Sequence, residues 1–288
     1  MNTRVSSVTP TKPSRVRSRQ EFTLAQLKQA RKRIDPHVVS LTAPDSYEAE
    51  QYRKLRYVLE QRHTPGDALL VGIGSPAPGD GKSLTALNLA GSLAQDMGAR
   101  ILLIDSDLRR HSTAIRQNLA LGNVAVPGLV DAIVTPELTL QKVTRRIAPL
   151  NLSFVLTGSK TSAPYEVLSS PRLGELLDEA RRSYDYVIVD SPPIVPVSDC
   201  RVIARWIDGF LMVVGAHLTP RPMLAEALNI LGPDKVFGLV YNGGEELLTK
   251  YYGYGYQGYG RPAREASADR DSWLQETETV FGWKRRGG

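Results

Sequence analysis

Cysteine is almost absent from this sequence, which has one, Cys200, among 288 residues. A single cysteine excludes an internal disulfide framework and fits a reducing compartment, so we expect Cys200 to be a small buried apolar residue. Long apolar runs are also missing. The longest candidate, residues 209–216, has the length of a strand and is too short to cross a bilayer. The N-terminus has no hydrophobic segment, which argues against a secretory signal and favours a cytoplasmic chain.

Acidic residues are scarce at the start of the chain, where the first 33 positions carry one, Glu21, against nine lysines and arginines. Such a basic segment can meet an anionic membrane surface, an acidic partner or nucleic acid. A solvated tail is the simpler interpretation, and we expect no nucleic-acid partner. The polar composition and the prolines predict that residues 1–40 form a largely disordered arm, with a short helix over residues 22–33.

Beyond this arm, short runs of valine, isoleucine and leucine alternate with helical patterns. The predicted strands occupy residues 68–75, 101–105, 152–158, 186–190, 209–216 and 236–242. The predicted helices occupy residues 46–62, 83–97, 170–184 and 220–231. Strands that are continuously apolar are buried on both faces, as in parallel sheets. The alternation therefore predicts an α/β fold: a mostly parallel, doubly wound sheet with helices on both faces.

The first predicted strand leads into SPAPGDGKS, residues 75–83, and then into a helix, which is the context of a phosphate-binding loop. Glycines in this loop let backbone N–H groups point toward an anion. Lys82 would reach the phosphates, and the Ser83 hydroxyl would bind Mg²⁺. The expected nucleotide-binding residues of the loop are Pro78, Gly79, Asp80, Gly81, Lys82, Ser83 and Leu84. The pattern G-x-x-x-x-G-K-S is incomplete, because Pro76 replaces its first glycine; an ordinary glycine-rich turn is the alternative.

Two predicted strands end in aspartate. Asp105 closes ILLID, with Asp107 two positions later, and Asp190 closes YVIVD. The carboxyl ends of parallel strands face the crevice where ligands bind. We assign Ser83, Asp105 and Asp190 to Mg²⁺, with Asp190 acting through water. Asp107 is then available to orient a tyrosine hydroxyl and accept its proton, and the reverse division between Asp105 and Asp107 stays open. Either aspartate alone would be an ordinary cap or loop residue.

A tract rich in tyrosine and glycine follows Asn242, at residues 251–260. Such a tract is poorly suited to a packed core and well suited to entering an active site in extended form. The expected phosphoacceptors are Tyr251, Tyr252, Tyr254, Tyr256 and Tyr259. The alternative is a low-complexity tail that is never modified.

Taken together, SPAPGDGKS, ILLIDSDLRR with its D-x-D-x-R, and VIVDSPP resemble the bacterial tyrosine autokinases (BY-kinases) of exopolysaccharide and capsule co-polymerase systems. The resemblance extends over residues 45–260 and includes residues 158–177, PVSD, GLVYN and the tyrosine tract. The family belongs to the deviant P-loop ATPases. Its relatives among the partition and septum-site ATPases carry a signature lysine where this sequence has Ala77, and this difference favours the kinase branch.

The resemblance implies a protein-tyrosine kinase that uses ATP and Mg²⁺ and autophosphorylates its C-terminal tyrosines in trans, regulating exopolysaccharide polymerisation and export. It implies that the catalytic residues are Lys82, Asp105, Asp107, Arg109 and Asp190, and that Asn242 contacts adenine. The expected organisation is a basic arm over residues 1–40, a P-loop kinase domain over residues 41–246 and a tyrosine-rich tail over residues 247–288.

Glu50, Arg53 and Arg56 share one face of the helix predicted over residues 46–62. They could form a solvated charged face with weak internal pairing. The family resembled uses this E-x-x-R-x-x-R motif for contacts between subunits, which implies a homo-oligomer, with a ring as the expected form. The resemblance also implies a separate membrane chain-length protein that recruits the chain to the inner face of the membrane and activates it, and a cognate tyrosine phosphatase. A partition-type ATPase without kinase activity and a nucleotide-binding scaffold of the export machinery are the alternatives.

Overall fold

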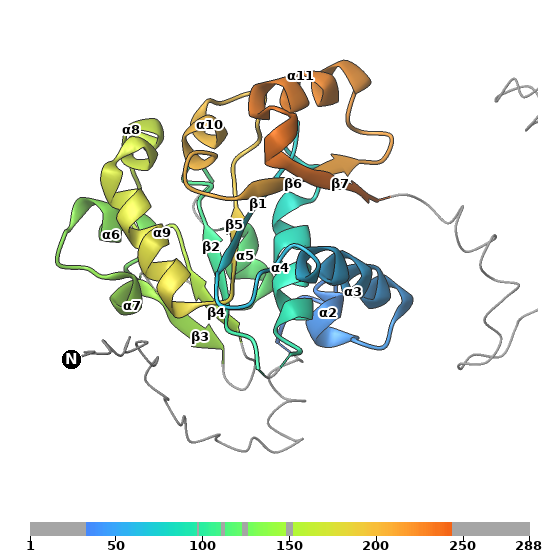
Figure 1. The fold of residues 1–288 in the computed structure, drawn as a ribbon, viewed down its shortest axis with the longest axis horizontal. Coiled ribbons are helices and arrows are strands. Elements are labelled where there is room, and N and C mark those ends of the chain that lie inside the picture. The colour runs from blue at the N-terminus through green and yellow to red at the C-terminus, as the bar shows by residue number, and fades with distance from the viewer. Residues whose placement is uncertain (1–32, 97, 111–112, 123–125, 148–151, 244–288) are drawn as a thin grey trace, which may run out of the picture. The chain divides into compact units, whose positions relative to one another are not determined.

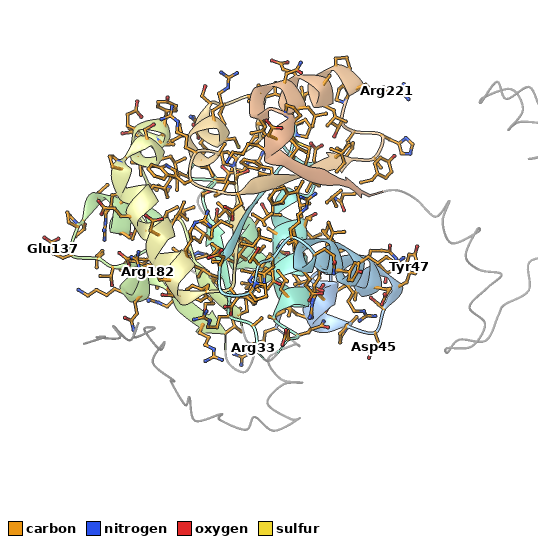
Figure 2. The ribbon with its side chains drawn as sticks, in the orientation of Figure 1. Arg33, Asp45, Tyr47, Glu137, Arg182 and Arg221 are labelled. Atoms are coloured by element: carbon orange, nitrogen blue, oxygen red, sulfur yellow. The ribbon has the colours of Figure 1, made fainter. Side chains whose placement is uncertain are left out.

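The computed structural model describes residues 33–96, 98–110, 113–122, 126–147 and 152–243. The predicted helix over residues 22–33, apart from its last residue, lies outside this part of the chain, and so does the tyrosine tract. Figure 2 shows the side chains of the described part as sticks on the ribbon. Arg33, the first described residue, is labelled there.

The described residues contain seven strands, which form one sheet in the order β3-β4-β2-β5-β1-β6-β7 (Figure 1). Their bounds are β1 Leu69–Gly74, β2 Ile101–Asp105, β3 Arg145–Ile147, β4 Leu152–Val155, β5 Tyr186–Asp190, β6 Gly209–Gly215 and β7 Val236–Asn242. The pairs formed by β1, β2, β4, β5, β6 and β7 are parallel, and β3 pairs with β4 in the antiparallel direction. The predicted α/β class with a mostly parallel sheet is therefore confirmed.

Helices cover both faces of the sheet (Figure 1). One face is covered by α2 Val39–Thr42, α3 Tyr47–Glu60, α4 Lys82–Leu93 and α5 Thr113–Asn118. The other face is covered by α6 Leu129–Val134, α7 Leu140–Val143, α8 Pro164–Ser169, α9 Pro171–Ser183, α10 Asp199–Ile203 and α11 Arg221–Leu231. A 3₁₀ turn, Pro233–Lys235, leads from α11 into β7.

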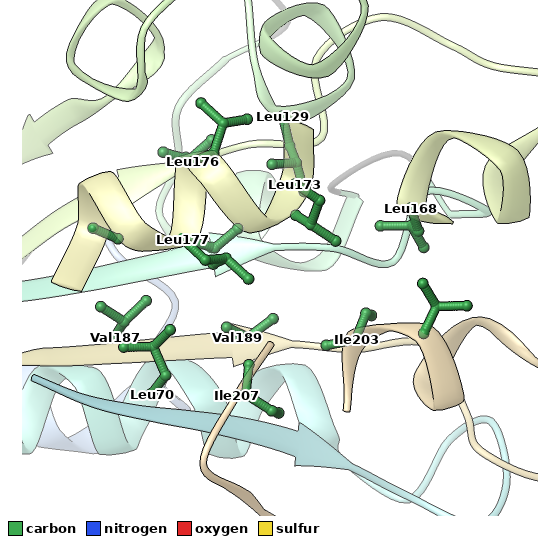
Figure 3. Close-up of a cluster of buried hydrophobic side chains, with 14 of the residues drawn as sticks. Leu70, Leu129, Leu168, Leu173, Leu176, Leu177, Val187, Val189, Ile203 and Ile207 are labelled. Atoms are coloured by element: carbon green, nitrogen blue, oxygen red, sulfur yellow. The ribbon is translucent and has the colours of Figure 1, made fainter. Parts of the chain in front are cut away.

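Alternate residues of the central strands feed two separate hydrophobic clusters, because successive side chains of a strand point to opposite faces of the sheet. Leu70 and Val187 belong to the cluster under α9, whereas Val71 and Ile188 belong to the cluster under α4. Figure 3 shows leucines of α9 lying over Leu70, Val187 and Val189. The central strands β1, β2 and β5 are buried along their whole length, as the continuous apolar runs predicted.

The packed core starts earlier in the chain than the boundary predicted at residue 41. Ile34 and Val38 are buried in the cluster under α4, and Asn88 of that helix accepts a hydrogen bond from the backbone N–H of Ser40. Residues 34–40 are thus part of the fold and not of a disordered arm. Their few apolar side chains gave too weak a pattern to predict this packing from the sequence.

Cys200 is fully buried, as expected, and its thiol donates a hydrogen bond to the backbone carbonyl of Pro192 at 3.0 Å. Burial raises the pKa of this thiol to about 12, so the thiol stays protonated and inert near neutral pH. None of the helices in the described ranges is long and apolar enough to span a membrane.

Close packing in the middle of the sheet predicts an asymmetry between two strand glycines. A Cβ atom at Gly72 in β1 would lie 2.5 Å from Cε1 of Phe210 and 2.6 Å from Cδ1 of Ile207. Gly72→Ala should therefore lower the free energy of unfolding by about 1–3 kcal/mol, the usual cost of overpacking a core. The measurement is the urea-unfolding midpoint at a constant m-value.

The matched control is Gly238→Ala in the edge strand β7. Among the described residues, the nearest heavy atom to its added Cβ is Cδ2 of Leu211 at 4.0 Å, an ordinary contact distance. We expect this variant to unfold at nearly the wild-type midpoint, since the methyl group meets no obstacle. Equal losses in the two variants would show that the packing around β1 does not limit stability.

Candidate functional site

The loop between β1 and α4 has the backbone of an anion cradle. Gly79 and Gly81 have φ angles of 94° and 92°, in the left-handed region that L side chains avoid. Gly81 is the N-cap of α4, and no side chain caps this helix in the part of the chain that the structure describes. Backbone N–H groups in the first helical turn lack helical partners, so they can hydrogen-bond a phosphate. Lys82 and Ser83 follow at the start of the same helix.

Asp80 behaves differently from its exposed neighbours in this loop. Its side chain is buried and accepts hydrogen bonds from the backbone N–H of Ala77 at 3.0 Å and from the Thr219 hydroxyl at 2.7 Å. The side-chain amide of Asn242 donates to the backbone carbonyl of Asp80 at 2.9 Å. The structure thus brings Asn242 beside the phosphate loop, and its contact with adenine remains a prediction.

The acidic strand ends meet beside this loop. Asp105 and Asp190 are register partners on the neighbouring strands β2 and β5. Asp107 lies two residues after the end of β2, and its carboxylate Oδ2 lies 3.1 Å from Nζ of Lys82. Their side chains line a cavity of about 240 Å³ together with Ser83. The structure therefore brings together every residue predicted to bind the metal and four of the five predicted catalytic residues.

Three carboxylates line this cavity against two cationic side chains, Lys82 and Arg110. Burial raises the pKa of Asp190 to about 6, while the charge of Lys82 and a hydrogen bond from Ser83 act in the opposite direction. Among the described residues, Oδ1 of Asp107 and Oδ1 of Asp190 have no hydrogen-bond partner. Buried oxygens without partners cost stability, and a hard divalent cation with its water ligands would compensate them.

A complete protein cage for a metal is absent from the described ranges, which hold no group of three or more histidine, cysteine, aspartate or glutamate side chains arranged as ligands. The cavity offers instead the Ser83 hydroxyl and carboxylate oxygens. This donor set suits Mg²⁺, which keeps several waters and takes few protein ligands.

Arg109 is the predicted catalytic residue that does not line the cavity. Its Nε donates to Oδ2 of Asp199 at 2.9 Å and its Nη2 donates to Oδ1 of the same residue at 3.0 Å. Asp199 is fully buried at the start of α10. The pair therefore fixes the loop after β2 to the helical layer that contains α10. The contact raises the pKa of Arg109 further, and the guanidinium remains charged.

Arg110 lines the cavity instead, together with Ala114 and Gln117 of α5. None of these three residues was predicted from the sequence to belong to the site. Arg110 is the last residue of the quoted ILLIDSDLRR, so a signal was available, whereas α5 is too short to have given one.

The motif on α3 is engaged within the chain. Arg53 pairs with Glu50 and donates to the Pro44 carbonyl at 2.5 Å. Arg56 pairs with Glu60 and donates to the Ser92 carbonyl at 3.0 Å, which links α3 to α4. Arg56 thus has a structural contact that the helical spacing did not predict.

Known proteins resemble the chain in sequence and in structure. Residues 71–204 match a family model described as an AAA domain. The tyrosine-protein kinase YwqD of Bacillus subtilis is 33% identical over 231 residues, which cover 78% of this chain and 93% of that protein. The succinoglycan biosynthesis transport protein ExoP of Rhizobium meliloti is 31% identical over 206 residues, which cover 71% of this chain but 26% of that protein.

A solved structure agrees with these relatives. The kinase domain of the Escherichia coli tyrosine kinase ETK superposes with a TM-score of 0.66 at 25% identity, covering 80% of this chain and 84% of that domain. YwqD is matched over nearly its whole length, and the phosphate loop and the two acidic strand ends fit the same family. The chain therefore belongs to the bacterial tyrosine-protein kinases built on the P-loop fold.

Proposed function

We propose that this kinase uses ATP and Mg²⁺ to phosphorylate the tyrosines of residues 251–259 on a neighbouring copy of the same chain. One observation carries the proposal: the buried ion pair between Lys82 and Asp107 lies beside Asp105 and Asp190 at the mouth of a phosphate loop. Phosphoryl transfer to tyrosine needs a phosphate cradle, cationic charge on the phosphates and a carboxylate for the incoming hydroxyl. Lys82 and the three carboxylates line one cavity here, and the phosphate loop leads directly into Lys82.

The contacts support the following roles for these residues. The loop amides and the ammonium group of Lys82 would hold the phosphates. Ser83, Asp105 and Asp190 would hold Mg²⁺, which supplies charge neutralisation on the phosphates when bound. Asp107 keeps one carboxylate oxygen without a partner among the described residues, so this oxygen can orient the tyrosine hydroxyl and accept its proton while the new O–P bond forms.

The biological setting is part of the proposal. The relative ExoP is named for succinoglycan biosynthesis and transport. We infer that phosphorylation of the tail regulates polymerisation and export of an exopolysaccharide. In this setting the expected partners are a membrane chain-length protein that recruits the chain to the inner membrane face and activates it, and a phosphatase that resets the tail.

Phosphate mapping tests the reaction. The purified protein incubated with Mg²⁺ and ATP should acquire phosphotyrosine confined to residues 251–259, measured by mass spectrometry. Lys82→Met removes the ammonium group beside the phosphates and should lower the rate by about 100-fold or more, the usual cost of losing an electrostatic stabiliser. An unfolding curve of the variant establishes that it is folded.

The negative outcomes separate the alternatives. ATP hydrolysis without phosphotyrosine, even with a candidate membrane activator present, would support a partition-type ATPase. If neither ATP turnover nor phosphotyrosine is seen, the chain acts as a nucleotide-binding scaffold.

The subunit contact predicted for α3 can be tested at Arg53. Arg53→Ala should shift the assembly toward monomers and slow phosphorylation between subunits, as measured by light scattering after size exclusion and by the phosphotyrosine assay. Arg56 is a poorer choice, since its contact with Ser92 stabilises the fold. Lys54→Ala, at the exposed neighbouring position, is the matched control. An unchanged assembly in Arg53→Ala would remove this residue from the interface.

The buried acid Asp190 predicts a conflict between stability and activity. Its folded-state pKa is about 6, above the ordinary aspartate value of 3.8, so the unfolded chain releases this proton at lower pH than the folded chain. The free energy of unfolding should therefore fall as the pH rises from about 4 to 6 and stay lower above that window. Asp190→Asn removes this loss and should be about 1–3 kcal/mol more stable than the wild type at pH 7.5 without Mg²⁺.

The same variant should be inactive, and its stability advantage should vanish below pH 4. Urea-unfolding midpoints across this pH range check the prediction, with the exposed Asp67→Asn as control. A constant difference between Asp190→Asn and wild type at all pH values would contradict the raised pKa.

A further inference from the structure

Asp80 is a buried carboxylate that follows two exposed residues of the phosphate loop. Its residue is 2% exposed, whereas Pro78 and Gly79 beside it are exposed. A carboxylate removed from water needs hydrogen-bond donors to replace those of the solvent. The two donors that the structure gives it come from different parts of the fold.

The first donor lies within the phosphate loop, where the backbone N–H of Ala77 reaches Oδ2 of Asp80 at 3.0 Å. The second is the Thr219 hydroxyl, which lies 2.7 Å from Oδ1. Thr219 also accepts the backbone N–H of Gly215 at 2.9 Å. Because a hydroxyl has one proton and that proton goes to Asp80, the two bonds form a directed relay from the end of β6 to the loop.

The turn over residues 215–219 is shaped to deliver this hydroxyl. The backbone N–H groups of Leu218 and Thr219 both donate to the Gly215 carbonyl, and His217 adopts a φ of 57°, uncommon for a residue with a side chain. A Cβ atom at Gly215 would lie 2.9 Å from Oδ1 of Asp80. Only glycine lets the phosphate loop approach the end of β6 this closely.

A third contact comes from β7. The Asn242 side chain donates to the backbone carbonyl of Asp80 at 2.9 Å, and the Asn242 carbonyl accepts the N–H of Ala216 at 2.7 Å. Asp80 is therefore held through its side chain by the turn after β6 and through its backbone by the end of β7. A turn can close with hydrogen bonds among its own residues, so these contacts with β6 and β7 are additional to those that the turn requires.

We propose that Asp80 and Thr219 are positioning residues that brace the phosphate loop, from the end of β6, in the shape that receives the nucleotide phosphates. The brace keeps the loop amides and the two left-handed glycines in place before the nucleotide arrives. Because the loop is already ordered in the free protein, nucleotide binding does not have to pay the entropic cost of ordering it, and the affinity is higher. The brace does not touch Lys82, Asp107 or Asp190, so it acts on binding and not on the transfer step.

Thr219→Val tests this, because it keeps the shape of the side chain and removes the hydroxyl. The probe is a fluorescent ADP analogue with Mg²⁺, titrated into the full chain. Loss of a hydrogen bond to a charged group predicts an affinity about 10-fold weaker. Thr219→Ser keeps the hydroxyl and should restore affinity. Thr144→Val, which loses a comparable hydrogen bond to the Leu140 carbonyl far from the loop, should bind normally.

A double variant separates the brace from general damage. Asp80→Ala combined with Thr219→Val should bind no more weakly than Asp80→Ala alone, since each change already removes the Thr219–Asp80 contact that joins the turn to the loop. In the phosphotyrosine assay, Thr219→Val should raise the KM for ATP about 10-fold and leave kcat within about 2-fold. Wild-type affinity in Thr219→Val, additive losses in the double variant, or a loss confined to kcat would each overturn the proposal.

The inference uses nucleotide binding by the loop and not the identity of the phosphorylated residue. The titration therefore gives its answer even if the protein phosphorylates no tyrosine. An absence of phosphotyrosine with normal ADP binding would count against the proposed function alone.

Discussion

The buried ion pair between Lys82 and Asp107 is the contact around which this site is organised. It joins the first residue of α4 to the loop after β2, in a cavity that holds three carboxylates and the cationic side chains of Lys82 and Arg110. A buried pair of this kind contributes little net stability, because desolvation offsets its Coulomb energy. Its significance is chemical: three carboxylates against two cationic side chains leave an excess of negative charge that a bound cation would balance, and burial raises the pKa of Asp190 among them.

The sheet makes this concentration of charge possible. Asp105 and Asp190 lie far apart in sequence, but β2 and β5 are neighbours in register, so both acids arrive at the same edge. β1 pairs with β5 on its other side and delivers the phosphate loop to that edge. The apolar residues of these strands fill two clusters that fix the register, since a shift by one residue would exchange the two faces.

Sequence patterns predicted this framework well where the elements are long or fully buried. The strands predicted over residues 101–105, 186–190 and 236–242 agree with β2, β5 and β7. The pattern missed β3 and short helices such as α5 and α10, because three to six residues cannot display a period. It also gave no sign that Arg109 would pair with Asp199, a contact between residues 90 positions apart. Contacts of this range depend on the fold and leave no local trace.

Binding and chemistry are divided between the two halves of the sheet. The acids come from β2 and β5, on one side of the strand that carries the phosphate loop, and the groups that hold Asp80 come from the ends of β6 and β7, on the other side. Backbone shape and charge are thus controlled separately. The loop has its left-handed glycines in place, while the partnerless oxygens of Asp107 and Asp190 still lack compensation among the described residues. A site arranged in this way can bind a nucleotide through a rigid loop. Its carboxylates still depend on the metal and the incoming hydroxyl for partners, so the reaction requires both to be present.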